Sequence, residues 1–161
     1  MRSELLEKSS GKYQTGERAV EYIDNGAARS MTLLAAQSGT LFAVDMSTVD
    51  NNVTVTLPTA SAAVAGGNYD FCFTVDSDDD ADFIINTGAA GTDIYGGIIT
   101  LAANSTIDAF AGISTITVDG SVAQSAEGLK MSFVCDGTNW HLSGHIMTAV
   151  GTVHLVGAAG V

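Results

Sequence analysis

The chain has 161 residues, of which 46% are hydrophobic and only 15% are charged, and its formal net charge is −12 at pH 7. This length predicts one domain that buries a core without needing disulfides or metals. From residue 30 onward Lys130 is the only Lys or Arg. Nucleic acid and anionic membrane surfaces bind clustered cations, so the composition argues against both as partners.

Residues 1–28 are predicted to form an extended N-terminal arm on a β domain of residues 29–161. The arm is polar and glycines interrupt it. Residues 17–23 could form a short helix or, because Val20 and Tyr22 alternate with polar residues, a strand. The cations of the first 29 residues are Arg2, Lys8, Lys12, Arg18 and Arg29. Five acids in the same stretch balance them, so the remainder of the chain carries the whole net charge.

Strand patterns are dense after residue 30. Residues 53–57 alternate apolar residues with threonines, and Pro58 ends that strand. Residues 69–75 form the clearest alternation, and we expect Phe71 and Phe73 to lie in the core. A further strand is predicted over residues 94–100, where adjacent glycines indicate a bulge or a close approach of two backbones.

Residues 129–147 predict a hairpin with an Asp-Gly turn, and Trp140 should anchor its core end. The chain shows about nine strand patterns with turn residues between them and no long helical periodicity. The fold class predicted is therefore all-β: an antiparallel β-sandwich or barrel. The uncharged C-terminal stretch, residues 148–161, is either a last strand of the sheet or an extension packed on a neighbouring subunit.

An acidic cluster follows the clearest strand. The spacing of Asp76, Asp78 and Asp80 is similar to the first half of a calcium-binding loop. Ala81 stands where such a loop needs Gly, and Thr87 stands where it needs Glu. We therefore predict no metal site, and these three aspartates are the only candidate cation ligands.

The sequence offers no catalytic constellation. His141 and His145 are four residues apart in a predicted strand, roughly 13 Å, which is too far to share a zinc ion. There is no nucleophile elbow and no phosphate-binding glycine loop. We expect no cofactor and no enzyme activity. The N-terminus has no apolar stretch typical of a secretory signal, so Cys72 and Cys135 are expected to be reduced thiols.

Three runs resemble β-rich virion proteins of tailed phages. The run at 31–42, MTLLAAQSGTLF, resembles their "LTaadSGtlf" opening. VTLPTA at 55–60, followed by GGNYDF at 66–71, is similar to a second run of these proteins, and DGTNW at 136–140 resembles their closing hairpin. The three runs occur in the family's order. They resemble capsid decoration (cement) proteins and also some tail and fibre modules.

The resemblance implies a non-enzymatic structural protein of a bacteriophage, a homotrimer on the outer surface of the capsid in the virion. Its partners would be the major capsid protein and its own copies. The cations expected to contact the capsid are Arg2, Lys8, Lys12 and Arg18. The alternative is a tail or fibre module that binds host surface glycans, for which Tyr95, expected in a loop-like setting flanked by glycines, is the candidate aromatic residue. A third reading, an enzyme that acts on glycans, would need a pair of carboxylates that the sequence does not single out.

Overall fold

The structure is a computed structural model of the chain. It describes residues 18–47, 51–75, 81–101, 106–120, 126–147 and 155–158. Strands dominate these residues, and one short 3-10 helix, Ala35–Gln37, joins two of them. None of the described segments forms a helix long and apolar enough to span a membrane.

Twelve strands form two sheets. The seven-stranded sheet has the order β1-β3-β5-β10-β11-β7-β8. Its strands are β1 Val20–Asp24, β3 Leu41–Asp45, β5 Asn68–Val75, β7 Ile94–Leu101, β8 Thr106–Ile113, β10 Lys130–Cys135 and β11 Trp140–Met147. The five-stranded sheet has the order β12-β9-β6-β4-β2. Its strands are β2 Arg29–Thr32, β4 Val53–Thr56, β6 Phe83–Asn86, β9 Thr115–Val118 and β12 Leu155–Ala158.

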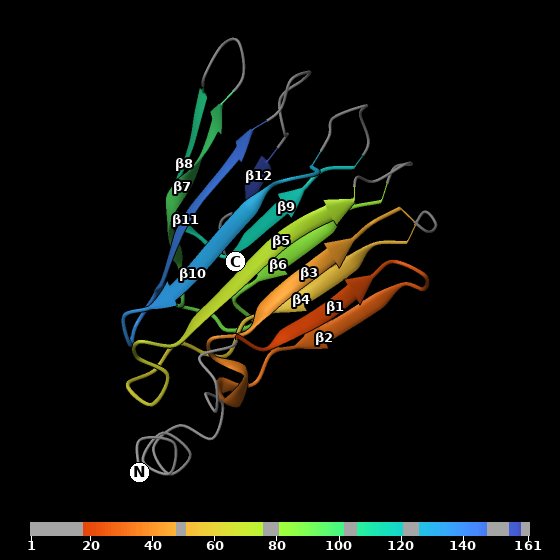
Figure 1. The fold of residues 1–161 in the computed structure, drawn as a ribbon. Helices are drawn as coiled ribbons and strands as arrows, with labels where there is room; N and C mark the ends of the chain where they lie inside the picture. Colours follow the sequence, from red (N-terminus) through yellow and green to blue (C-terminus); the bar gives the residue numbers. More distant parts are fainter. Residues whose placement is uncertain are drawn as a thin grey trace, which may run out of the picture.

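The two sheets stack as the layers of a sandwich (Figure 1). From β1 to β6 the chain changes sheet at every connection, so each strand lies beside the strand two places earlier in the sequence. In Figure 1, β1, β3 and β5 lie in front of β2, β4 and β6. The all-β prediction is confirmed, and the arrangement is an open sandwich whose sheets do not close into a barrel.

The predicted antiparallel pairing is wrong for half of the strand pairs. The pairs β1·β3, β3·β5, β2·β4, β4·β6 and β11·β7 are parallel. Parallel neighbours need a crossover connection, and for the four parallel pairs among β1 to β6 a strand of the opposite sheet provides that crossover. The count of about nine strands was also too low, because four-residue strands such as β2 show too few alternations to be recognised.

Aromatic side chains fill the space between the sheets. Phe71 and Phe73 are fully buried, and both rings meet Phe83 from the opposite sheet, with centroids 5.9 and 5.1 Å apart. Trp140 is also fully buried; its ring lies 5.6 Å from that of Tyr69, and its Nε1 donates to the Pro58 carbonyl at 3.2 Å. The three residues predicted to anchor the core therefore lie at the centre of the sandwich.

Strands lie at both ends of the described chain, β1 before the predicted start of the β domain and β12 near its end. Residues 20–24, which the sequence placed in the arm, form β1 and pair with β3, so the strand alternative for this segment is the one observed. Ile23 and Asn25 are buried, and the Asn25 side chain donates to the Met46 carbonyl at 2.7 Å. At the other end β12 pairs antiparallel with β9, as a last strand of the sheet.

Candidate interaction face

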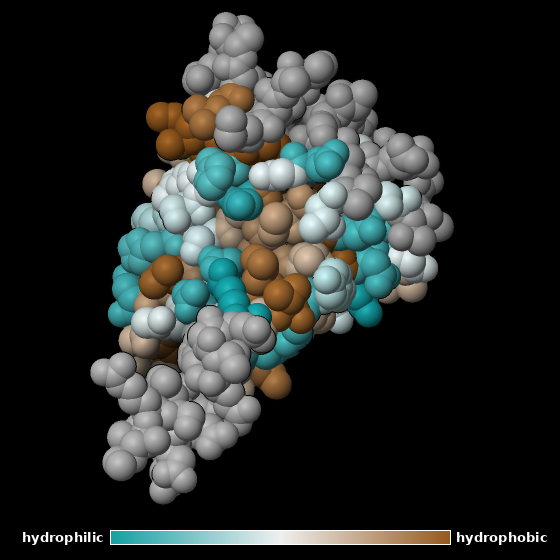
Figure 2. Space-filling model, in the orientation of Figure 1, coloured by the Kyte–Doolittle hydropathy of each residue, from teal (hydrophilic) through white to brown (hydrophobic). Residues whose placement is uncertain are grey.

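None of the described elements covers one side of the seven-stranded sheet, and we call this side the outer face. Eight large apolar side chains are exposed among the described residues, and seven of them belong to this sheet and point outward. They are Val20, Tyr22, Tyr95, Ile99, Leu101, Ile107 and Val134. In Figure 2, which views this face, hydrophobic surface gathers over β7 and β8. Scattered apolar residues are normal on a protein surface, but a contiguous group typically indicates an interface.

The strand register arranges the outer face into ridges and a floor. Lys130, His145, Ile99 and Ile107 lie opposite one another on β10, β11, β7 and β8, and they form one ridge. A floor of small residues lies beside this ridge, two residues away on each strand. It consists of Ser132, Ser143, Gly97 and Ala109. Side chains on one face of a sheet repeat every two residues, so this floor runs across the strands.

The floor widens into a groove of about 570 Å³ over β5, β10 and β11. Leu41 and Arg18 border it on one side, and Ile99, Lys130 and His145 border it on the other. This groove is a concave feature of the outer face that could receive a protruding segment of another protein.

The central strands of this face carry almost no net charge. The only carboxylate that points outward from β5, β10, β11, β7 or β8 is Asp70, among the side chains the structure describes. The Arg18 guanidinium forms an ion pair with Asp70, and it also donates to the carbonyls of Gly39 at 2.8 Å and Thr40 at 3.3 Å. Lys130 is exposed, and none of the described carboxylates forms an ion pair with it. On a chain with a net charge of −12, this region is locally uncharged to weakly basic.

The cations predicted to contact a capsid divide into two groups. Arg18 contacts the body through Asp70 of β5 and through the carbonyls of Gly39 and Thr40 just before β3, and no pattern in the sequence predicts these contacts. Arg2, Lys8 and Lys12 lie outside the described residues, as do Asp76, Asp78 and Asp80. Within the described part of the chain, no group of three or more His, Cys, Asp or Glu residues could hold a metal ion.

The β10–β11 hairpin has a hydrogen-bonded tip. The Asp136 carboxylate accepts bonds at 2.7 Å from the backbone N–H groups of Thr138 and Asn139, and His141 Nε2 lies 2.7 Å from its second oxygen. The Asn139 bond first, then those from His141 and Thr138, lower the pKa of Asp136 to about 2. His141 and His145 are both exposed, and His141 has this structural role.

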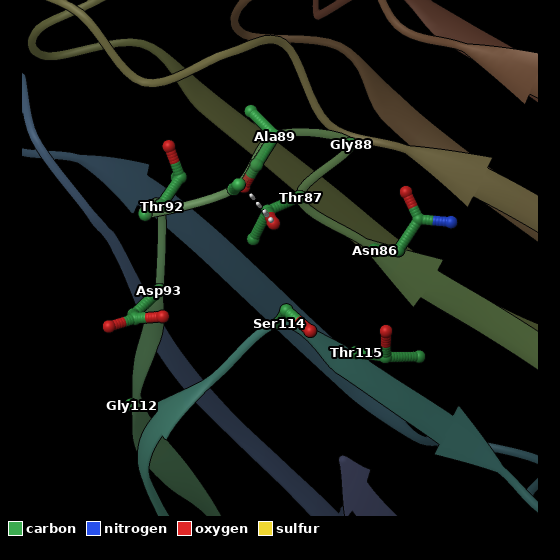
Figure 3. A pocket seen from close by; sticks show the side chains of 11 residues that line it. Asn86, Thr87, Gly88, Ala89, Thr92, Asp93, Gly112, Ser114 and Thr115 are labelled. Atoms are coloured by element: carbon green, nitrogen blue, oxygen red, sulfur yellow. Dashed lines mark hydrogen bonds between the residues drawn. The ribbon is translucent and has the colours of Figure 1, made fainter. Parts of the chain in front are cut away.

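A second hollow, of about 640 Å³, lies where β6 ends, β7 begins and β8 passes into β9. Figure 3 shows Thr87 and Ser114 close together at this hollow, where the backbone N–H of Thr87 donates to the Ser114 carbonyl at 3.0 Å. Asp93, which also lines it, accepts a long hydrogen bond of 3.5 Å from the Tyr95 hydroxyl. Tyr95 lies in β7 rather than in a loop, is 37% exposed, and its ring centroid lies 6.3 Å from that of His141.

The two cysteines are free and lie on opposite sides of the seven-stranded sheet. Cys72 alternates with the buried Phe71 and Phe73 and therefore points outward, opposite Lys130. Cys135 is buried at the inner side. This geometry agrees with the expected thiol state and leaves no route to a disulfide between them.

Neither of two comparisons with known proteins identifies a relative of this chain. A scan against models of protein families finds no match to this chain, and a search of curated proteins also finds none.

Proposed function

We propose that this chain is a non-enzymatic decoration protein that binds the outer surface of a phage capsid as a trimer and stabilises the head. The observation that carries the proposal is the outer face, which holds seven of the eight exposed large apolar side chains of the described residues and whose central strands are nearly uncharged, on an otherwise strongly acidic sandwich. Such a surface suits lasting contact with protein. From the resemblance of residues 31–42, 55–60, 66–71 and 136–140 to phage virion proteins, we infer that this contact is made within a virion, with the capsid or with other copies of this chain.

In this role, the body and the N-terminal residues would make different kinds of contact. The body offers apolar surface, whereas three cations of residues 1–17, Arg2, Lys8 and Lys12, are available to meet an acidic shell. Arg18 is already paired with Asp70, so we assign it to the body rather than to the capsid contact. Repetition over a symmetric shell would multiply many weak contacts into a stable coat.

A binding experiment with capsids tests this proposal. Purified chain is mixed with phage particles that lack it, and the particles are then sedimented. We expect the full chain to sediment with the particles, and a fragment of residues 18–161 to remain in the supernatant because it lacks the three cations. If the full chain fails to bind, the decoration role is wrong; if the fragment binds as well as the full chain, the role of the arm is wrong.

A tail or fibre module that binds host glycans is the second candidate, and the surroundings of Tyr95 favour it. An exposed aromatic ring next to a carboxylate and a hydroxyl-lined hollow offers stacking and hydrogen bonds together, which a sugar can use. Binding to an array of host glycans that is lost in Tyr95→Ala, without binding to capsids, would favour this candidate over decoration.

A further inference from the structure

We propose that the outer face over β5, β10, β11, β7 and β8 is the surface by which one copy of this chain contacts the next copy. This inference deepens the proposed function, from which it takes the expectation of a trimer, and it assigns the subunit interface to particular residues. The occupant we infer is an acidic surface of the second copy.

Charge is the first argument for a second copy. Two chains that each carry a net charge of −12 repel each other over most of their surfaces. Over the central strands of the outer face, the one described outward carboxylate, Asp70, is neutralised by Arg18, which leaves Lys130 as the excess charge. The strands of the five-stranded sheet also carry no carboxylate, but none of their described side chains is an exposed large apolar residue, and Lys130 is not among them. The central strands of the outer face are therefore a region that an acidic copy can approach without repulsion, and Lys130 could pair with one of its carboxylates.

Apolar surface and shape are the second argument. Ile99 and Ile107 are 44% and 71% exposed, and they continue the ridge that Lys130 and His145 begin. Beside this ridge lies the groove of about 570 Å³, with Ser132 and Ser143 at its floor. A ridge beside a groove allows the shape complementarity that well-packed interfaces have. Burial of the aliphatic side chains would supply most of the free energy of association.

The charge distribution also indicates how the copies are arranged. A two-fold contact would place the same face on both sides, and this face carries a cation without a free described carboxylate to receive it. The face is complementary instead to the acidic remainder of the chain. A contact between two different patches is heterologous, and it closes into a ring when the rotation allows. That arrangement is compatible with a trimer.

The test is the oligomeric state of the full-length chain in solution, measured by sedimentation equilibrium over a range of concentrations. The two variants are Ile99→Glu and Lys130→Glu. Both positions are exposed, so these substitutions should leave the fold intact. We expect the wild type to be a closed oligomer and each variant to dissociate at a concentration at least about tenfold higher, since an unpaired carboxylate buried in a contact opposes association strongly.

Two matched controls separate the face from general effects. Leu34→Glu changes the one exposed large apolar residue of the described chain that lies off this face, and Arg29→Glu makes the same charge change as Lys130→Glu on the opposite sheet. Both controls should keep the wild-type assembly. Circular dichroism and the urea midpoint of each variant establish that it is folded.

The outcomes are distinct from those of the capsid experiment, because no capsid is present. A monomeric wild type overturns the inference, and so does an oligomer that both face variants leave intact. A monomeric wild type whose binding to capsids is lost in Lys130→Glu would assign the face to the shell instead. A wild-type oligomer that the face variants disrupt, but that does not bind capsids, would support the interface while refuting the decoration role.

Discussion

At the scale of single residues, Trp140 holds the largest buried side chain and joins the hairpin to the opposite side of the core. Its indole N–H satisfies the Pro58 carbonyl at 3.2 Å, and its ring packs edge-on against Tyr69. We predict that Trp140→Ala lowers the free energy of unfolding by about 3–5 kcal/mol, through a cavity and an unsatisfied carbonyl. Urea denaturation at equal protein concentration measures this loss. Ser143→Ala, on the exposed side of the same strand, should change it by less than about 0.5 kcal/mol. Equal effects would contradict the anchoring role.

Asp136 makes the hairpin tip sensitive to acid. Because three hydrogen bonds lower its pKa to about 2 in the folded protein, its contribution to stability is present above the unfolded-state pKa and is lost as the pH falls toward 2. We predict that Asp136→Asn is less stable than the wild type at pH 6, and that the difference shrinks below about pH 4. Melting temperatures of both proteins from pH 6 to pH 2 measure the effect. A difference that stays constant over this range would show that the charge is not responsible.

Some of these residue roles could be predicted and others could not. Strict alternation along residues 69–75 predicted that Phe71 and Phe73 face the core. The Asp-Gly turn predicted the hairpin whose second strand begins at Trp140. The partner of Arg18 could not be predicted, because Asp70 is 52 residues away in the sequence and only the parallel pairing of β3 with β5 brings it close. Periodicity identifies the direction of a side chain but not its neighbour.

At the scale of elements, Gly96 permits the pairing of β7 with β11. Its φ is +127°, and a Cβ atom there would lie 1.9 Å from the Leu142 carbonyl oxygen, which is the close backbone approach that the adjacent glycines predicted. We predict that Gly96→Ala destabilises the fold by more than about 3 kcal/mol, because both the dihedral angle and the contact are violated. The matched control is Gly66→Ala, where φ is +80° but no atom lies within 4 Å, so only the dihedral term applies, about 1–2 kcal/mol. Urea midpoints that fall equally would contradict the close-approach argument.

The boundary between arm and body can be tested by truncation. A fragment of residues 29–161 loses Ile23 from the core and exposes the edge of β3, whereas a fragment of residues 18–161 keeps β1. We predict a clearly lower melting temperature for the shorter fragment, since burial of one isoleucine alone contributes about 1.5–3 kcal/mol. The longer fragment should melt close to the full chain. Thermal melts followed by circular dichroism distinguish the two, and equal melting of both fragments would place the boundary at residue 29 after all.

Most strands were visible in the sequence, but their partners were not. Alternating patterns identified the strands now described as β4 and β5, and the strand predicted over residues 94–100 is now described as β7. The same patterns cannot show that β1 to β6 change sheet at each step, because a strand looks alike whether its neighbour is parallel or antiparallel. The expectation of antiparallel pairs followed from the short connections, and it failed where those connections lead to the other sheet.

At the scale of the whole molecule, the distribution of charge and apolar surface is the property that function would use. The net charge of −12 makes two copies repel each other over much of their surface, and over the central strands of the outer face that repulsion is locally absent. The composition alone does not indicate where such a surface lies. The exposed apolar residues of the outer face extend from Val20 to Val134 in the sequence. They share one side of the sheet only because strand pairing places them there.

The most direct test of the decoration role is the copy number of this chain in purified virions, measured against the major capsid protein by quantitative mass spectrometry. The account predicts a number comparable with that of the capsid protein, as expected for a coat that covers the shell. A few copies per particle would contradict decoration and move the chain to the tail, where the glycan hypothesis would lead. Absence from virions would contradict both functions.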